Sequence, residues 1–251
     1  MPKAAPPAAE TVEEIESLQR VRRQTSDGVD AVDRALTIVD AFSDGTPRLA
    51  LKDLAQRTGF NKPTILRLCA SLERFGYLLR NPRTGEYSLG VSLWRLGSLF
   101  RHNLTFADVI RPELALLAQQ TGESASFYII GGKGRICLLR ANSPRPVRHH
   151  IEEGEEFSLE HGSTSHVLKA FTGQAGAKYQ AIRDAGYAVA LGERDPDIAG
   201  VSAPVFGPER MLIGAITLSG LLQNYTEQRV EVLVDIIQQS AQKISRELGA
   251  A

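Results

Sequence analysis

The sequence predicts an α+β fold in two parts: a winged helix-turn-helix near the N-terminus, followed by an α/β domain with a mainly antiparallel sheet. Residues 28–90 show the periodicity of three helices followed by a β-hairpin. Residues 104–251 contain strand-like runs both before and after helical ones, which is typical of an α+β domain. Basic residues are concentrated in the first part, although the whole chain has a formal net charge of zero.

The composition excludes several protein classes. The chain has 251 residues, of which 43% are hydrophobic and 23% charged, and this balance excludes complete disorder, collagen-like repeats and coiled-coil rods. No apolar run approaches the ~20 residues that cross a bilayer, and the N-terminal MPKAAPPAAE lacks the apolar segment of a secretory signal. Only two cysteines, Cys69 and Cys137, are present, which suits buried thiols in a reducing compartment. We therefore expect a cytoplasmic protein with no membrane partner.

Charge is distributed unevenly along the chain. Residues 1–27 begin Pro/Ala-rich and continue Glu-rich, and they are predicted to form a flexible arm. Residues 20–101 hold 14 Lys/Arg and 8 Asp/Glu, a net charge of +6, whereas residues 102–251 hold 14 and 17. The basic segment is therefore where we expect an anionic partner.

Three helices are predicted within this basic segment. Residues 29–42 carry an apolar stripe at positions i, i+3, i+4 and i+7, and residues 51–58 form a shorter amphipathic helix. Gly59 follows the second helix, at a position that favours a left-handed backbone. The third helix is predicted to begin at Asn61 or Lys62, since Pro63 suits a first turn.

The third helix, over residues 61–75, has two different faces. One is apolar and the opposite one is polar and basic, with a single acidic residue on the whole helix. A hairpin is predicted after it, because Asn81–Gly85 is a loop of hairpin length between two β-like runs, Tyr77–Arg80 and Glu86–Leu89. The apolar face comprises Ile65, Leu68, Cys69, Leu72 and Phe75, and the polar face comprises Thr64, Arg67, Ser71 and Arg74.

This combination of helices, turn and hairpin predicts a surface that binds double-stranded DNA. The major groove is about 12 Å wide and admits one α-helix, which needs a cationic outer face and an apolar inner one. Arg67 is placed to bind a guanine edge with both guanidinium donors, and the arm residues Arg20, Arg22 and Arg23 add further contacts. The candidate DNA-binding residues are Lys62, Thr64, Arg67, Ser71 and Arg74 on the helix and Arg80, Arg83 and Thr84 on the hairpin.

The rest of the chain is predicted to contain a linker helix and a second domain. Residues 91–103 form the linker helix, and a helix over 104–121 is expected to bend at Pro112. A final amphipathic helix begins after Thr226, a good N-cap. Between them we expect strands at 126–130, 135–141, 146–151, 187–191, 200–206 and 211–219, and helices at 162–171 and 174–185.

Several of these segments together resemble the IclR family of bacterial transcriptional regulators. The resemblance lies in LAQRTGFNKPTILRL at residues 54–68, FGY at 75–77 and GEYSLG at 85–90. In the second half, GYAV at 186–189, APV at 203–205 and SG at 219–220 occur in the family's order and spacing. The resemblance to the family covers about residues 28–248.

The resemblance implies a domain order and a set of partners. Residues 1–27 would be the arm, 28–90 the DNA-binding winged helix, 91–103 the linker and 104–251 a GAF-like domain for effector binding and oligomerisation. Such regulators are homodimers or homotetramers on partly palindromic operators, and a small organic effector, a carboxylate or an aromatic catabolite, modulates them. No catalytic residue, metal or other cofactor is expected, and the protein is predicted not to be an enzyme.

Candidate effector-binding residues come from three places in the second domain. Gly162, Ser163 and Thr164 begin a helix, where free N–H groups and hydroxyls bind anions, although either hydroxyl could instead only cap that helix. Thr217 and Ser219 share one strand face, but buried hydroxyls also occur in ordinary cores. Arg148 and His150 share a face of the predicted strand 146–151, where a cation could pair with a carboxylate of the ligand or lie on a solvated edge. The complete set is Cys137, Arg148, His150, Gly162, Ser163, Thr164, Ser202, Thr217 and Ser219, although a small core residue explains Cys137 better than a reactive thiol does.

The sequence departs from the family pattern around this proposed pocket. Ala190 and Leu191 stand where an acidic residue is common, Ser165-His166 replaces a Gly and a basic residue, and Leu221 follows Ser219-Gly220 in place of Pro. These differences predict a less polar pocket, suited to a larger or aromatic effector.

Two other functions are consistent with parts of the sequence. A hydrolase or metalloenzyme built on the second domain would use the histidines at 149, 150, 161 and 166, but their spacing matches no zinc motif. No Walker loop, Gly-x-Ser-x-Gly or HExxH occurs. The third possibility is an architectural DNA-binding protein with an empty second domain.

Overall fold

The computed structural model describes residues 28–104, 106–132 and 134–250. The predicted arm over residues 1–27, with Arg20, Arg22 and Arg23, lies outside the described residues. The described chain divides into two compact units, one ending at Asn103 and the other continuing from Leu104. Each unit has its own apolar core, so each is described separately.

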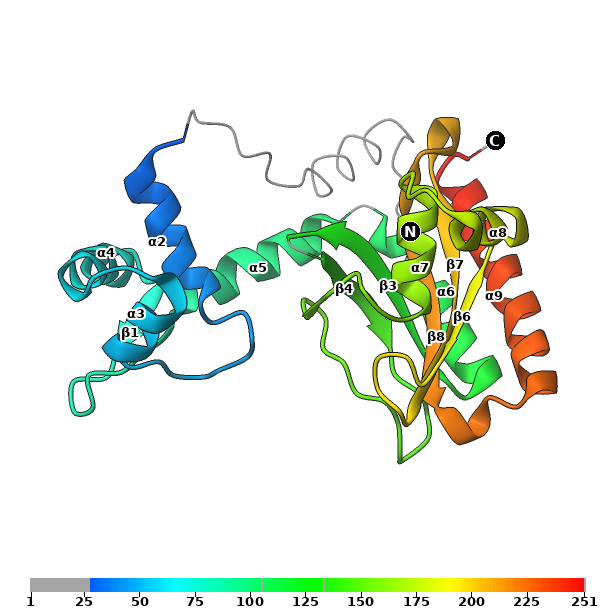
Figure 1. The fold of residues 1–251 in the computed structure, drawn as a ribbon, viewed down its shortest axis with the longest axis horizontal. Coiled ribbons are helices and arrows are strands. Elements are labelled where there is room, and N and C mark those ends of the chain that lie inside the picture. The colour runs from blue at the N-terminus through cyan, green and yellow to red at the C-terminus, as the bar shows by residue number, and fades with distance from the viewer. Residues whose placement is uncertain (1–27, 105, 133, 251) are drawn as a thin grey trace, which may run out of the picture. The chain divides into compact units, whose positions relative to one another are not determined.

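The N-terminal unit is a winged helix-turn-helix (Figure 1). Gly59 ends the second helix with a φ of 73°, and the Asn61 side chain accepts a hydrogen bond from the Thr64 N–H to cap the third. These local signals explain why the predicted helix boundaries agree with the structure to within two residues. The elements are α2 (Asp30–Asp40), α3 (Leu51–Thr58), α4 (Lys62–Arg74), β1 (Leu78–Arg80), β2 (Tyr87–Leu89) and α5 (Val91–Asn103).

The core of this unit fixes the direction in which α4 faces. Ile65, Cys69 and Leu72 of α4 are buried against α2, α3 and the hairpin. Leu49 pairs with Tyr87 and thereby ties the segment before α3 to the hairpin. One prediction for the apolar face is wrong: Phe75 is 64% exposed, because it is the C-cap residue and no longer follows the helical repeat.

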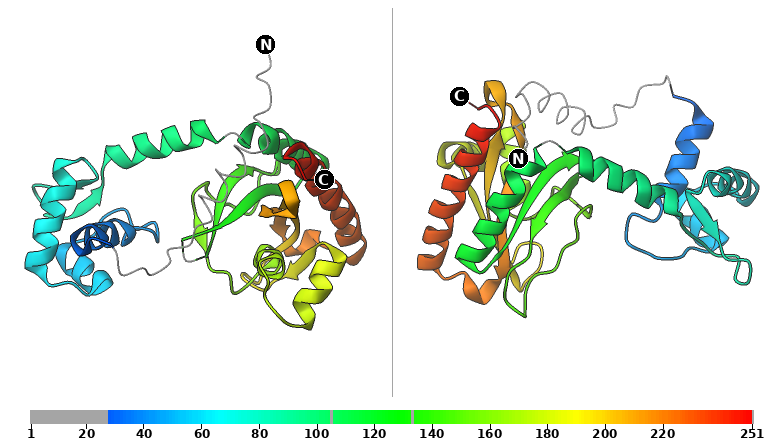
Figure 2. Two further views of the ribbon diagram at one scale, coloured as in Figure 1. Left: turned by 90° about the horizontal axis from the view of Figure 1, so that it is seen from above. Right: turned by 180° about the vertical axis from the view of Figure 1, so that it is seen from behind.

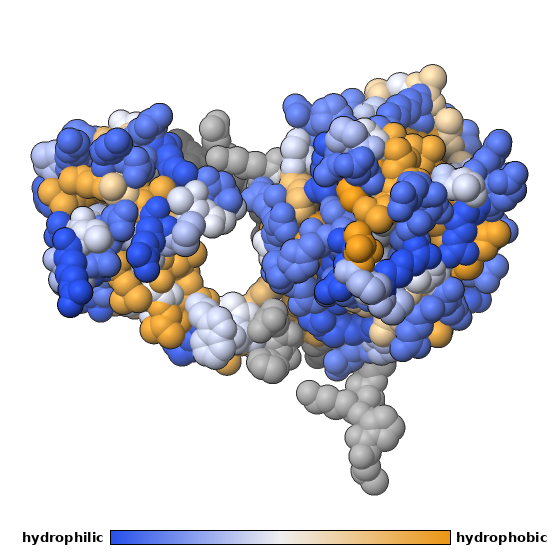
Figure 3. All heavy atoms as spheres, turned by 90° about the horizontal axis from the view of Figure 1, so that it is seen from below, coloured by the Kyte–Doolittle hydropathy of each residue, from blue (hydrophilic) through white to orange (hydrophobic). Residues whose placement is uncertain are grey.

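Apolar side chains also remain exposed on this unit (Figure 3). More than half of the exposed large apolar side chains of this unit lie on α2 and α5, where Trp94 is 71% exposed. The set on these two helices comprises Val32, Leu36, Val91, Trp94, Leu96, Leu99 and Phe100.

The C-terminal unit is built on a six-stranded antiparallel sheet with strand order β5-β4-β3-β8-β7-β6. It is an α+β unit, as the sequence predicts, and its first two strands form the predicted hairpin around Gly132. The strands are β3 (Ser124–Gly131), β4 (Gly134–Ala141), β5 (Glu156–Phe157), β6 (Ala188–Leu191), β7 (Ile198–Phe206) and β8 (Leu212–Leu221). The helices are α6 (Ala107–Thr121), α7 (Ser163–Phe171), α8 (Ala177–Ala185) and α9 (Glu227–Glu247).

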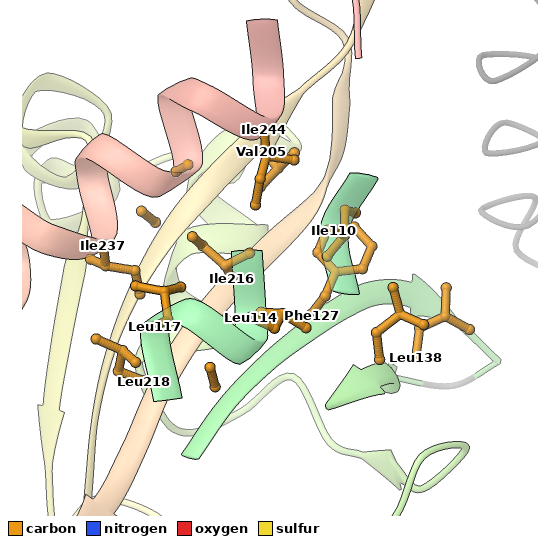
Figure 4. Packing of buried hydrophobic residues seen from close by; sticks show 14 of the residues in the cluster. Ile110, Leu114, Leu117, Phe127, Leu138, Val205, Ile216, Leu218, Ile237 and Ile244 are labelled. Atoms are coloured by element: carbon orange, nitrogen blue, oxygen red, sulfur yellow. The ribbon is translucent and has the colours of Figure 1, made fainter. Parts of the chain in front are cut away.

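The two faces of this sheet carry different side chains. Successive residues of a strand point to opposite faces, so Val201 and Ala203 face one way while Ser202 faces the other. Helices α6 and α9 pack side by side on the first face (Figure 2, right), where large apolar residues form the main core. Ten of them are labelled in Figure 4: Ile110, Leu114, Leu117, Phe127, Leu138, Val205, Ile216, Leu218, Ile237 and Ile244.

The opposite face is covered by α7, with α8 packed beside it (Figure 1). Here Ser202 of β7 pairs directly with Thr217 of β8, so two hydroxyls lie together on the same face of the sheet. A polar, small-residue face beneath a helix start is the setting of the candidate site.

One predicted strand is absent. Residues 146–151 form no strand, and the sheet edge is instead completed by β5. The physical reason is that Pro144 and Pro146 have no N–H to donate to a ladder. The segment is held by side chains instead: Arg140 Nη2 donates to the His149 carbonyl at 2.5 Å.

Candidate functional site

The outer face of α4 and the hairpin carry the residues predicted to bind DNA. Lys62, Arg67, Ser71 and Arg74 are exposed on α4, and Thr64 is half-exposed. This follows from the helical repeat, because the same helix buries Ile65, Cys69 and Leu72. The hairpin exposes Arg80, Arg83 and Thr84.

The cations on this face have no acidic partner among the described residues. The ion pairs described in the N-terminal unit join Arg34 to Asp30 and Arg57 to Asp44, away from α4 and the hairpin. Arg80 lies over the Tyr87 ring at 5.6 Å, which holds its guanidinium against the hairpin surface. The arrangement is an unneutralised positive surface of the kind that phosphates bind.

Arg48 belongs to the same surface and was missed by the sequence analysis. It lines a surface hollow of about 460 Å³ with Arg80 and Arg83 at the base of the hairpin. The bridge between Leu49 and Tyr87 brings Arg48 to the hairpin. Because this bridge is a tertiary contact, it leaves no periodic pattern in the sequence.

A cluster of buried hydroxyls lies where α7 begins over the sheet. Ser163 Oγ is 2.8 Å from Ser202 Oγ, and Thr164 Oγ1 is 2.8 Å from Thr217 Oγ1. Ser202 Oγ and Thr217 Oγ1 are also 2.8 Å apart. The structure therefore brings together four of the predicted ligand residues, from α7, β7 and β8. Each hydroxyl has a partner here, so the cluster is satisfied as it stands.

A small cavity of about 50 Å³ adjoins this cluster. Its walls include Gly162, Ser163, Thr164, Thr217 and Ser219 from the predicted set. The remaining lining residues include the neutral His149 and several charged residues that were not among the predicted ones: Arg135, Glu193, Arg194 and Asp195. The predicted less polar pocket is thus not what the structure shows.

Arg135 is the most deeply buried of these charged groups, with 4% of its surface exposed. Its Nη1 donates to the Ser158 carbonyl at 2.6 Å, to the His161 carbonyl at 3.1 Å and to the Ser165 hydroxyl. It forms no ion pair with any described residue, its Nε has no partner, and burial lowers the pKa of this guanidinium to about 10. A buried cation without a counter-ion is costly, so the site favours an anion.

His149 and Arg194 form the second polar group of the cavity. Arg194 Nη2 lies 2.8 Å from His149 Nε2, and His149 Nδ1 lies 3.3 Å from Ser219 Oγ. Because a guanidinium can only donate, Nε2 accepts and the proton of the neutral ring is on Nδ1. Arg194 also covers the Phe157 ring at 4.6 Å, so it packs on β5 from the loop between β6 and β7.

Three of the predicted ligand residues lie elsewhere. Arg148 and His150 are exposed and line no part of the cavity, and His150 pairs instead with Glu152 at 2.8 Å. The expectation that they share a strand face is wrong, because this segment forms no strand. Cys137 is buried beside Tyr128 and Ile151, outside the cavity lining, and burial raises the pKa of its thiol to about 11.

The histidines considered for a metal site have separate partners. His149 contacts Arg194, His150 pairs with Glu152, and His166 pairs with Glu193. Within residues 28–104, 106–132 and 134–250, no three His, Cys, Asp or Glu side chains lie close enough to hold a metal ion. The rival hypothesis of a metalloenzyme therefore has no geometric support in the described chain.

His149 makes the stability of the C-terminal unit depend on pH. Burial and the nearby Arg194 and Arg140 lower the pKa of His149 from 6.5 to about 4. Between these values the unfolded chain binds more protons than the folded one, so stability is present above pH 6.5 and is lost as pH falls towards 4. Since the ring is only partly buried, we expect the wild-type protein to lose about 1–2 kcal/mol more than His149→Gln between pH 7 and pH 5. Urea denaturation at both pH values measures this, and equal losses in the two proteins would contradict it.

Comparison with known proteins identifies both units. Residues 31–82 match the family described as IclR helix-turn-helix domain, and residues 176–246 match the family described as Bacterial transcriptional regulator IclR C-terminal. The HTH-type transcriptional regulator XynR of Escherichia coli is 24% identical over 88% of this chain and 98% of its own length. The Glycerol operon regulatory protein of Streptomyces coelicolor is 26% identical over 88% of this chain and 97% of its own.

Solved structures share the fold. An IclR transcriptional regulator from Alicyclobacillus acidocaldarius has a TM-score of 0.75 at 24% identity, covering 88% of this chain and all of that one. An IclR homolog from Microbacterium hydrocarbonoxydans, crystallised with 4-hydroxybenzoate, has a TM-score of 0.70 at 20% identity, covering 87% and 99%. No helix of the described residues is long and apolar enough to span a bilayer. The two family matches and the full-length relatives together show that this chain belongs to the IclR family of bacterial transcriptional regulators, with a DNA-binding helix-turn-helix domain.

Proposed function

We propose that this protein is a one-component regulator that binds operator DNA through α4 and the hairpin and responds to a small organic carboxylate bound in its C-terminal unit. It acts in the cytoplasm as a homodimer or homotetramer and catalyses no reaction. Residues 28–90 form the DNA-binding domain in this proposal, 91–103 the linker, and 104–251 the effector and oligomerisation domain.

The DNA-binding part of the proposal is supported by the exposed cations of α4 and the hairpin. A helix with one buried apolar face and one cationic face fits the major groove. The arginines of the hairpin and Arg48 would contact the adjacent phosphates. Binding should therefore weaken steeply with salt, since each phosphate contact releases counter-ions.

The observation that supports the effector most directly is the buried guanidinium of Arg135 in the cavity wall, which forms no ion pair with any described residue. A carboxylate would supply the missing negative charge through charge-assisted hydrogen bonds. The hydroxyls of Ser163, Thr164 and Thr217 would orient the remainder of the ligand. The relative crystallised with 4-hydroxybenzoate, itself a carboxylate, is consistent with this class of effector.

The exposed apolar residues of α2 and α5 support self-association. Several large apolar side chains are exposed on α5 alone, among them Trp94, Leu99 and Phe100, and such a concentration is typical of a protein interface. Two-fold pairing of the N-terminal units would present two α4 helices to successive turns of the duplex.

Arg67→Ala tests the DNA-binding proposal. If Arg67 binds a guanine edge, its loss should lower affinity for DNA from the protein's own promoter region by ~1–3 kcal/mol while affinity for a scrambled duplex changes little. Fluorescence anisotropy with both duplexes measures the difference. Arg67→Lys is the matched control, because it keeps the charge but cannot form the bidentate contact. An equal loss on both duplexes would make Arg67 a phosphate contact, and no loss on either would remove α4 from the interface.

A further inference from the structure

The loop between β6 and β7, residues 192–197, places a carboxylate of the protein itself at the start of α7. Glu193 Oε2 accepts a hydrogen bond from the Gly162 N–H at 3.2 Å and lies 2.6 Å from His166 Nε2. A carboxylate can only accept, so His166 Nε2 donates to it. Lys178 Nζ lies 3.1 Å from the same His166 nitrogen, and its positive charge also favours the anionic form of Glu193.

These groups form a recognition site for a carboxylate. The first N–H groups of a helix have no partner within the helix and form its positive end, which stabilises anions. His166 is buried, and its donor points from the first turns of α7 towards the same oxygen. Burial alone would raise the pKa of Glu193, but the hydrogen bonds from His166 and Gly162 hold this pKa below its usual value. Glu193 is therefore bound here as an anion.

The same site opens onto the cavity beneath α7. Gly162 and Glu193 line that cavity together with Arg135, whose Nε is buried and has no hydrogen-bond partner. The cavity volume of about 50 Å³ holds one or two water molecules, whereas small-molecule sites measure about 300–1,000 Å³. No organic effector can enter while the loop keeps this position.

We propose that the Glu193 carboxylate occupies a subsite that the carboxylate of the effector takes over when it binds. This subsite adjoins the buried guanidinium, because a Cβ at Gly162 would lie 3.7 Å from Arg135 Nη2. The subsite consists of the Gly162 N–H and His166, with Lys178 beside them. It binds a carboxylate, and in this structure the carboxylate is the protein's own. An effector of the class proposed above binds by displacing Glu193, and the loop moves with it. That movement separates Arg194 from His149 and Phe157 and opens the cavity. The effector part of this inference rests on the proposed function, whereas the subsite itself does not.

Glu193→Ala with acetate as the added ligand tests the subsite without knowledge of the natural effector. Removing the side chain vacates the subsite, so the variant should melt at a lower temperature than the wild type. Acetate at 50 mM should then raise its melting temperature by about 3 °C or more, because a ligand that binds only the folded state stabilises it. The wild type, with Glu193 in place, should shift by less than a third of that. Sodium chloride at the same ionic strength separates specific binding from screening.

Glu160→Ala is the matched control. Glu160 is an exposed glutamate in the segment that leads into α7, its carboxylate has no ion pair with a described residue, and its loss changes the net charge equally. This variant should respond to acetate as the wild type does. Glu193→Gln, which keeps the shape but not the charge, should respond to acetate more than the wild type and provides a second variant if Glu193→Ala folds poorly. An acetate response no larger in Glu193→Ala and Glu193→Gln than in Glu160→Ala would overturn the proposal.

Operator binding separates this inference from the proposed function. Titration with 4-hydroxybenzoate and pyruvate in the presence of promoter DNA reports any effector response. If acetate rescues Glu193→Ala but neither carboxylate changes the DNA affinity of either protein, the subsite stands and the effector class is wrong. If carboxylates alter DNA affinity with the same apparent Kd in wild type and Glu193→Ala, the regulator stands and the role of Glu193 is wrong. We expect the apparent Kd to be at least tenfold lower in Glu193→Ala.

Discussion

Gly90→Ala is expected to destabilise the N-terminal unit by about 3 kcal/mol and to abolish operator binding at 37 °C. A Cβ at Gly90 would lie 2.1 Å from the Gly76 carbonyl oxygen and 2.8 Å from the carbonyl carbon of Tyr77. Both neighbours are backbone atoms in the connection that sets the hairpin against α4, and the Gly90 N–H donates to the Tyr77 carbonyl at 2.8 Å. Relief of this clash requires the hairpin to move, since no side chain can turn away, and inserted core groups cost typically 1–3 kcal/mol or more.

Gly97→Ala is the control for this substitution. Gly97 lies inside α5, and apart from its chain neighbours and the backbone of its own helix no described atom comes within 4 Å of where its Cβ would be. Alanine there should stabilise the helix by about 0.5–1 kcal/mol. Urea denaturation and DNA-binding anisotropy on both variants measure the contrast. An unchanged denaturation midpoint and normal operator affinity for Gly90→Ala would show that the hairpin is not fixed by this contact.

Arg135→Met is expected to destabilise the C-terminal unit by about 2–3 kcal/mol and to remove the effector response. The substitution removes a donor from the Ser158 and His161 carbonyls and from the buried Ser165 hydroxyl, and a buried polar group that loses its partner costs about 1–3 kcal/mol. Removing the desolvation cost of the buried cation offsets part of that loss. Because the segment from Ser158 to His161 leads into α7, its loosening also disturbs the carboxylate subsite.

Arg148→Met provides the matched comparison. Arg148 is an exposed arginine of the same unit whose one described hydrogen bond, to the Arg145 carbonyl, is 3.4 Å long. Its substitution should change the free energy of unfolding by less than about 0.5 kcal/mol. Chemical denaturation gives the stabilities, and effector titration at 15 °C, where Arg135→Met remains folded, gives the response. A full carboxylate response in Arg135→Met would show that the buried guanidinium is not part of the ligand site.

The elements that the sequence predicted well are those with local causes. The helix ends at Gly59 and Asn61, the apolar repeat of α4 and the cap at Thr226 each depend on residues within one or two turns. Phe75 was misplaced because a periodic pattern does not show where a helix stops. The strand expected at 146–151 does not form, because the prolines at 144 and 146 have no N–H groups to donate to a neighbouring strand.

The residues of the candidate site were predicted only in part, for a physical reason. Ser163, Thr164, Ser202 and Thr217 were found because a helix start and strand alternation are visible in sequence, and the fold brings their hydroxyls within 2.8 Å of a neighbour. The charged residues of the cavity come from a strand and two loops that are distant in sequence. Nothing local marks Arg135 as buried, because an arginine on a strand next to a hairpin is usually solvated.

The sequence by itself determined that the chain has a cationic helix-turn-helix and hairpin ahead of an antiparallel α+β domain, since periodicity, caps and turn residues act over short distances. Only the tertiary structure decided which side chains meet: Arg48 with the hairpin arginines, Arg135 with the cavity, and Glu193 with the start of α7. The reason is that burial and charge pairing depend on distances between segments far apart in the sequence, which the pairing of strands in the two sheets sets and no local pattern encodes.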